Sequence, residues 1–226
     1  MRMNVHSHNG VWVIFGAMRV TDGPSGRDAG RRNHILAAAE RAFVRQGFHA
    51  ATMHDVAAEA DMSPGNLYRY FRSKEAIVGG LCARDLAALA DDFGALTRSD
   101  DIFGGIERML RKQLVAEPRQ RFQLIVEIWA EATRNPYIAA ICLVFDGQVQ
   151  SGLTSVIDSA KRSGAAAPQI DTAFAVQAII TIGIGLFKRR AHETDFDGES
   201  QLALALGLIS AVLCGAAHPL EVGPKR

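Results

Sequence analysis

Apolar residues recur at intervals of three and four along most of the 226-residue chain. This spacing gathers them on one face of an α-helix, whereas a half-buried strand needs strict alternation. The sequence contains no alternating run of useful length, so the pattern predicts an all-α fold. Glycine and proline mark where the helices end. The predicted helices cover approximately residues 32–46, 52–60, 64–71, 73–93, 102–116, 118–134, 136–163, 171–191 and 199–215.

Capping residues define the short helices near the N-terminus. Gly47 stands where a left-handed residue closes the first helix. Thr52 offers its hydroxyl as the N-cap of the second helix, and Asp55 follows three residues later, as in a capping box. Ser63 caps the third helix, with Pro64 at the first helical position, where a missing N–H costs nothing. Two short helices joined by a tight turn predict a helix-turn-helix unit, with the first helix packed against it.

The third helix separates core positions from surface positions. Leu67 and Phe71 are spaced i, i+4 and therefore share the inner face, which turns the polar residues beside them outwards. The N-terminus of such a helix fits the major groove, so Asn66 is placed to meet a base edge or a phosphate. The hydroxyls of Tyr68 and Tyr70 are placed to reach phosphate oxygens. Tyrosines at helical spacing are also common in cores, and that reading stays open.

Charge adds a modest signal. The chain has a net charge of +1, but residues 1–80 hold ten Lys/Arg against seven Asp/Glu, which suits a nucleic-acid contact in this part. Lys74 lies in the first turn of the fourth helix, where its charge and the free backbone N–H groups predict a phosphate seat.

Residues 35–81 resemble the DNA-binding domain of the TetR family of transcriptional regulators. The motifs Ala-Phe-x-x-x-Gly-Phe, Thr-x-x-x-Val-Ala and Leu-Tyr-x-Tyr-Phe-x-Ser-Lys-Glu occur in the family's order and spacing. By pattern only, segments 129–132 and 195–197 resemble the family's helical ligand-binding and dimerisation domain. The resemblance implies contacts to bases or the nearby backbone from the start of the third helix, and contacts to phosphates around it. The expected DNA-binding residues are Thr52, Ser63, Pro64, Gly65, Asn66, Tyr68, Arg69, Tyr70 and Lys74.

The sequence departs from the family at the turn, where Asp61 replaces the usual glycine. Aspartate tolerates the left-handed conformation better than most side chains, so we expect the turn to survive at a small cost. Its negative charge lies close to the expected DNA surface and is expected to weaken binding.

This reading divides the chain into three parts. We expect residues 1–27 to be a disordered N-terminal extension, residues 28–75 to bind DNA, and residues 76–226 to bind an effector and dimerise. The expected protein is a homodimeric repressor that leaves a palindromic double-stranded DNA operator when a small apolar or amphipathic molecule binds.

The last two predicted helices are apolar on more than one face, which predicts a dimer interface formed by helices of two chains. The alternative is that the second face packs inside the same subunit. The candidate interface residues are Phe174, Ala178, Ile182, Gly185, Leu186, Leu202, Leu206, Ile209 and Leu213.

The segments between 102 and 163 carry aromatic and apolar residues with a few polar ones, a composition typical of a small-molecule pocket but equally of a plain core. The candidate pocket residues are Phe103, Met109, Phe122, Ile125, Trp129, Tyr137, Phe145 and Gln148. Gly79 and Gly80 interrupt the fourth helix and are either a hinge between pocket and DNA or a place of close packing.

Several function classes find little support. The sequence has no H-E-x-x-H motif, no paired metal-ligand spacing and no nucleophile elbow, so we expect no enzyme, no cofactor and no metal site. Three scattered cysteines fit a reducing cytoplasm, and we expect no membrane contact. A protein of the same fold that binds DNA without responding to a small molecule is the main rival.

Overall fold

The computed structural model describes residues 26–217 and confirms the all-α prediction, since these residues form helices and no strand. Most of the expected N-terminal extension lies outside the described residues. The helices are α2 (Gly26–Gln46), α3 (Met53–Glu59), α4 (Pro64–Tyr70), α5 (Lys74–Thr97), α6 (Ile102–Arg111), the π-helical η1 (Lys112–Ala116), α7 (Arg119–Ala132), α8 (Pro136–Ser163), α9 (Thr172–His192) and α10 (Gly198–Leu213).

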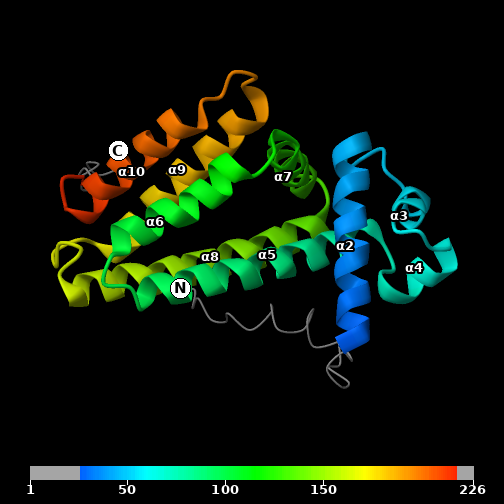
Figure 1. The fold of residues 1–226 in the computed structure, drawn as a ribbon, viewed down its shortest axis with the longest axis horizontal. Coiled ribbons are helices and arrows are strands. Elements are labelled where there is room, and N and C mark those ends of the chain that lie inside the picture. Colours follow the sequence, from blue (N-terminus) through cyan, green and yellow to red (C-terminus); the bar gives the residue numbers. More distant parts are fainter. Residues whose placement is uncertain (1–25, 218–226) are drawn as a thin grey trace, which may run out of the picture.

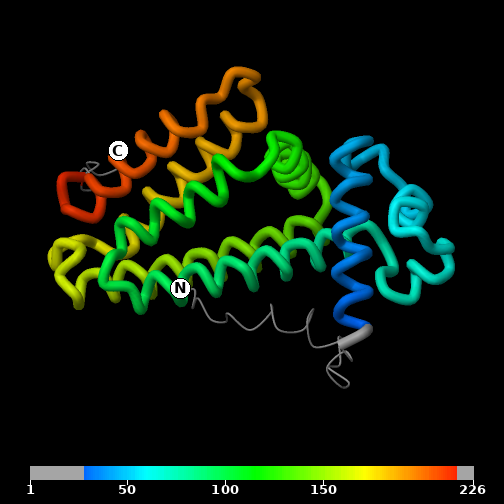
Figure 2. Tube along the Cα trace, in the orientation of Figure 1, coloured from blue at the N-terminus to red at the C-terminus, as the bar shows by residue number. Residues whose placement is uncertain are grey.

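The molecule is elongated, with the head α2–α4 at one end and the long helices at the other (Figure 1). Helices α5 and α8 run side by side along the long axis, and α6, α9 and α10 form a second layer over them. Helix α7 lies between this second layer and α2, as the chain trace also shows (Figure 2). The continuous helix α5 leads directly out of the head into the larger domain.

The head has a core of its own, built as the apolar pattern predicts. Ile35, Phe43, Val56 and Leu67 are each at most 1% exposed, and Phe71 is 2% exposed. These side chains come from all three head helices and form one cluster with the start of α5. Burying an apolar side chain of this size contributes about 1.5–3 kcal/mol to folding, so the cluster holds α4 in a fixed orientation.

Two further apolar clusters stabilise the larger domain. One joins α5, α6 and α8 to α9 and α10, and the other joins η1, α7, α9 and α10 around Leu114 and Phe122, each 1% exposed. The rings of Phe122 and Phe187 pack edge to face with their centroids 5.2 Å apart, and Trp129 stacks on Phe187 with a centroid distance of 6.5 Å.

Some boundaries differ from the predicted ones. Helix α2 starts six residues earlier than residue 32, and α5 continues to Thr97. The predicted helix 102–116 changes from α to π geometry at Lys112, and Leu114 within the wider turn is buried. Helices α8 and α9 are long and apolar enough to cross a membrane, judged by length and composition alone.

Candidate nucleic-acid interface

The turn between α3 and α4 is fixed by backbone geometry and by caps, as the sequence predicts. Asp61 has a φ of +50° and is the residue other than glycine with a left-handed φ among those described. The capping box is complete: Thr52 N donates to Asp55 Oδ2 at 2.8 Å, and Asp55 N donates to Thr52 Oγ1 at 3.2 Å. Ser63 Oγ accepts from Asn66 N at 3.3 Å and starts α4.

Helix α4 turns one face inwards and the other outwards. Leu67 is fully buried, whereas Tyr68 is 44% exposed and Arg69 is exposed. A Cβ built on Gly65 would have no neighbour within 4 Å, so the backbone is open to close approach at this point. The outer face of α4 therefore offers a phenol, a guanidinium and an uncovered backbone to a partner.

Tyr70 and Lys74 are more engaged within the protein than their predicted phosphate roles require. The carbonyl of Tyr70 accepts from Arg32 Nη1 at 3.1 Å, and the ring lies partly buried against the head core. Lys74 Nζ donates to the carbonyls of Phe48 at 2.8 Å and His49 at 3.0 Å. Since an ammonium has three donors, Lys74 keeps one for a phosphate while it holds the loop after α2.

Arg72 is a further candidate that the sequence motifs did not identify. It is exposed between the end of α4 and the start of α5, and it has no ion pair among residues 26–217. Its place beside Tyr70 puts a free positive charge near the outer face of α4. A basic residue inside the Phe-x-Ser-Lys-Glu motif was the available signal.

Ion pairs neutralise two other basic residues of the head, Arg41 and Arg45. Glu59 accepts from Arg41 at 2.8 Å and from Arg45 at 2.6 Å. The hydrogen bonds from Arg41 and Arg45 hold the pKa of Glu59 below its usual range. Arg41 and Arg45 therefore support the packing of α2 against α3.

The larger domain does not bring the predicted pocket residues together. Tyr137 is 73% exposed and Gln148 is exposed, so the single subunit places these two on its surface and not in an enclosed pocket. Phe103 and Met109 belong to one apolar cluster and Phe122 to another, while Trp129 stacks on a phenylalanine ring. Ile125 and Phe145 are partly buried and line neither cavity described below.

Two open cavities are formed by the described residues. One, of about 220 Å³, lies between α5 and α6 and includes Met109 as its one predicted lining residue. The other, of about 380 Å³, lies where α2, α7 and the end of α9 meet, and is lined by Phe43, Arg119 and Glu127 among others.

The predicted dimer residues divide into two groups. Leu186, Leu202, Ile209 and Leu213 are at most 5% exposed within one subunit, which is the alternative in which the apolar face packs inside the same subunit. Phe174, Ala178, Ile182 and Leu206 are partly buried, and Gly185 is exposed. The exposed apolar face instead consists of Ile184 at 49%, Leu204 at 48% and Leu208 at 44%. Period 3.6 identifies an amphipathic helix, but it cannot tell which of two apolar faces points inwards.

The two glycines of α5 also differ from each other. A Cβ on Gly80 would meet Leu36 Cδ2 at 2.8 Å and Phe71 Cε1 at 3.0 Å. Gly80 therefore lies at a place of close packing, which was the alternative to a hinge. A Cβ on Gly79 would meet only Ile141 Cδ1, at 3.7 Å, which is ordinary contact.

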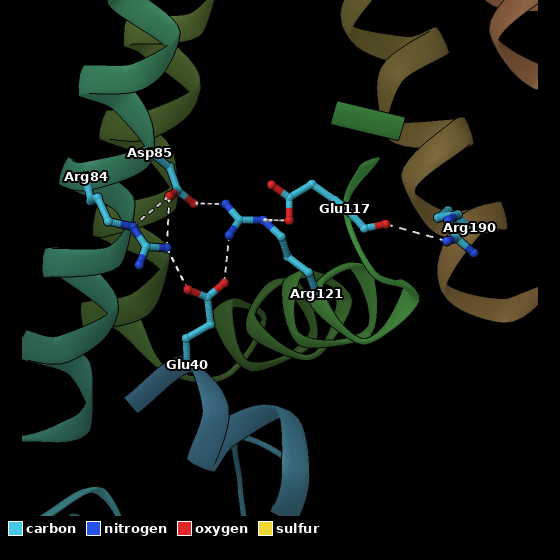
Figure 3. Close-up of polar contacts among 6 residues, drawn as sticks. All are labelled: Glu40, Arg84, Asp85, Glu117, Arg121 and Arg190. Atoms are coloured by element: carbon cyan, nitrogen blue, oxygen red, sulfur yellow. Dashed lines mark hydrogen bonds and ion pairs between the residues drawn. The ribbon is translucent and has the colours of Figure 1, made fainter. Parts of the chain in front are cut away.

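Helix α7 is joined to the head by polar contacts at two places, and Figure 3 shows the first of them, around Arg121. Arg121 pairs with Glu40 of α2 at 2.7 Å and with Asp85 of α5 at 2.8 Å. Arg84 pairs with the same two carboxylates, at 2.8 Å and 3.2 Å, which closes a ring of four charges. One helical turn and a half further on, Glu127 Oε2 accepts from Phe48 N at 2.6 Å.

Comparison with known proteins identifies the family. The family model of the bacterial regulatory proteins, tetR family, matches residues 35–81. The HTH-type transcriptional regulator UidR of Escherichia coli strain K12 is 30% identical over 160 residues, which cover 69% of this chain and 79% of UidR. The chain belongs to the TetR family. As a TetR-family protein it is a DNA-binding transcriptional regulator.

Two solved structures share the fold of this TetR-family chain. Salmonella enterica GusR aligns with a TM-score of 0.69 at 23% identity, covering 85% of this chain and 98% of GusR. A SmeT complex with triclosan aligns with a TM-score of 0.68 at 17% identity, covering 87% of this chain and 98% of SmeT. These likenesses confirm the predicted plan of an N-terminal helix-turn-helix followed by a helical domain.

Proposed function

We propose that the protein is a homodimeric repressor that binds a near-palindromic operator through α4 and leaves it when a small molecule binds the larger domain. The observation that carries the proposal is the division of α4, where Leu67 is buried and the neighbouring Tyr68 is 44% exposed. The start of α4, with Gly65 open to approach, enters the major groove, and Asn66 contacts a base edge.

Residues on and around α4 contact DNA phosphates. Thr52, Ser63 and Tyr70 supply hydroxyls, and Lys74 and Arg72 supply charge. Phosphate contacts release counterions, so binding weakens steeply as salt concentration rises. The protein acts in the cytoplasm, where the DNA is, and it is not an enzyme.

The first experiment selects bound DNA from a random pool and measures the affinity of the full chain for the selected site. Tyr68→Ala and Asn66→Ala lower affinity by about tenfold or more while the melting temperature stays unchanged, because both side chains lie outside the core. Ala58→Ser on the exposed surface of α3 is the matched control and binds normally. Full affinity in both α4 variants would show that another surface reads the DNA.

The dimer uses the exposed face of Ile184, Leu204 and Leu208 on α9 and α10. Two copies of this face bury each other's apolar surface and set the two α4 helices about 34–36 Å apart, one helical turn of DNA, or a multiple of that distance. Leu208→Asp gives a folded monomer in sedimentation, whereas Leu202→Asp unfolds the protein, because Leu202 is 2% exposed within the subunit.

Two observations support the response to an effector. The SmeT relative of similar fold was solved with triclosan, and the present chain has a cavity where α7 meets the head. The rival, a DNA-binding protein that ignores small molecules, is favoured by the scattering of the predicted pocket residues. A screen for compounds that both raise the melting temperature and release the operator separates the two functions.

A further inference from the structure

Arg190 in the last turn of α9 is a cation without a counter-charge among residues 28–217. Its Nε is buried and has no hydrogen-bond partner, and no other side-chain nitrogen or oxygen is in this situation within residues 28–217. Its one hydrogen bond is long, 3.5 Å from Nη2 to the carbonyl of Glu117 (Figure 3). An arginine stays protonated at any physiological pH, so this positive charge is permanent.

Other arginines in the same region are satisfied. Arg189, the preceding residue, donates from Nε and Nη2 to Glu193 and from Nη1 to Gln201. Arg121 contacts the carboxylates of Glu40 and Asp85. The part of the chain that the structure describes thus supplies carboxylates to Arg121 and Arg189 but none to Arg190. A buried polar group left unpaired in a native protein calls for a reason, and an absent partner is one.

The surroundings of Arg190 indicate what that partner is. The guanidinium carbon lies 5.8 Å from the ring centroid of Phe122 and 5.3 Å from that of Phe196. Ring faces stabilise the charge but leave N–H groups of the planar fork without acceptors. A carboxylate matches this fork with two parallel hydrogen bonds, and the aromatic rings suit an apolar body next to it.

We propose that Arg190 is the anchor for a small organic acid, whose carboxylate takes the unused N–H groups while its apolar part lies against Phe122 and Phe196. The side chain is partly exposed, so the acid reaches it from the surface of the larger domain. This site lies outside both cavities described above.

The anchor is connected to the head by a chain of polar contacts. Arg190 donates to the carbonyl of Glu117, and the carboxylate of Glu117 lies 3.7 Å from Arg121 Nε. Arg121 then pairs with Glu40 of α2, as Figure 3 shows. An acid that draws Arg190 away from Glu117 disturbs this chain. This second step, the release of the operator, rests on the proposed function, whereas binding of the acid does not.

The experiment measures acid binding to the purified full chain without DNA. Phenylacetate and octanoate are titrated by calorimetry and thermal shift, with phenylacetamide and inorganic phosphate as comparison ligands. We expect the two carboxylates to bind and raise the melting temperature, and the neutral amide to bind at least about tenfold more weakly, since charge-assisted bonds are the strong ones. Phosphate binding without carboxylate binding would indicate a general anion site and overturn the proposal.

Two variants of neighbouring residues locate the site. Arg190→Gln abolishes carboxylate binding, and without ligand it melts at or above the temperature of the wild type, because a buried N–H without an acceptor has been removed. Arg189→Gln, the matched control, loses existing bonds to Glu193 and Gln201, melts lower and still binds the acid. Equal carboxylate affinity in wild type and Arg190→Gln, or no carboxylate binding to the wild type, would refute the anchor.

A third variant keeps the test decisive if Arg190→Gln does not fold. Arg190→Lys retains the charge without the planar fork and is expected to weaken carboxylate binding by about tenfold. Operator release is then measured separately on wild-type protein. Acid binding without operator release would preserve the anchor and count against the effector role in the proposed function.

Discussion

Arg121 of α7 and Glu40 of α2 form an ion pair of 2.7 Å that joins the larger domain to the DNA-binding head. Their side chains are 22% and 21% exposed, so the pair is largely shielded from water. Such pairs interact more strongly than surface pairs because screening is weaker and both partners are costly to leave alone. The position of the head relative to α7 therefore depends on this contact.

Replacing Arg121 by glutamine should lower the free energy of unfolding by about 1–3 kcal/mol, because Glu40 and Asp85 lose a shared donor. Arg134→Gln is the control, since its pair with Glu131 is 65% exposed on the arginine side and should change stability by less than about 0.5 kcal/mol. Denaturant unfolding measures both. Similar losses in the two variants would mean that the junction contributes no more than an ordinary surface pair.

Two substitutions of Asp61 distinguish the effect of its left-handed backbone from the effect of its negative charge. Asp61→Asn keeps a residue that tolerates a φ of +50° and removes the negative charge, so operator affinity should rise at unchanged stability. Asp61→Val should lower stability by about 1–2 kcal/mol, because a β-branched side chain is poorly accommodated in the left-handed region. Melting curves and DNA titrations at fixed salt concentration check the pair. Unaltered operator affinity in Asp61→Asn would place this carboxylate away from the DNA.

The two glycines of α5 should respond in opposite ways to alanine. Gly79→Ala is expected to stabilise the protein by up to about 1 kcal/mol, because its Cβ fits and alanine favours a helix. Gly80→Ala should destabilise it, since its Cβ would lie 2.8 Å from Leu36 Cδ2. Thermal unfolding distinguishes them. If Gly79 is a hinge, Gly79→Ala also weakens the response of operator binding to an effector, and a normal response would rule the hinge out.

The three cysteines should react with a thiol reagent in a set order. Desolvation, with a smaller contribution from Cys142, raises the pKa of the Cys82 thiol to about 12. The thiolate is the reactive form, so at pH 8 Cys82 is almost wholly protonated and reacts most slowly. Desolvation and then Asp146 also raise the pKa of Cys142. The exposed Cys214 should be labelled first, as peptide mass spectrometry over time will show, and rapid labelling of Cys82 would contradict the packing of α5 against α8.

The sequence by itself determined the local structure of this protein. Helix starts at Thr52 and Ser63 and the left-handed residues at Gly47 and Asp61 depend on neighbours within a few residues, and the i, i+4 spacing of Leu67 and Phe71 marks the inner face of α4. Short sequence motifs specify such interactions, so the helix starts and turns of the head could be predicted from the sequence.

Only the tertiary structure decided what lies between distant helices. The packing of neighbouring helices decides which of Leu202 and Leu204 faces the core. It also decides whether Tyr137 lines a pocket and whether Gly80 has room for a methyl group. The same packing pairs Arg121 with Glu40 and leaves Arg190 Nε without a partner among the described residues. Residues this far apart in the chain are not related by the spacing of apolar positions. Apolar spacing specifies that a face is buried, but the choice of partner is a property of the assembled helices.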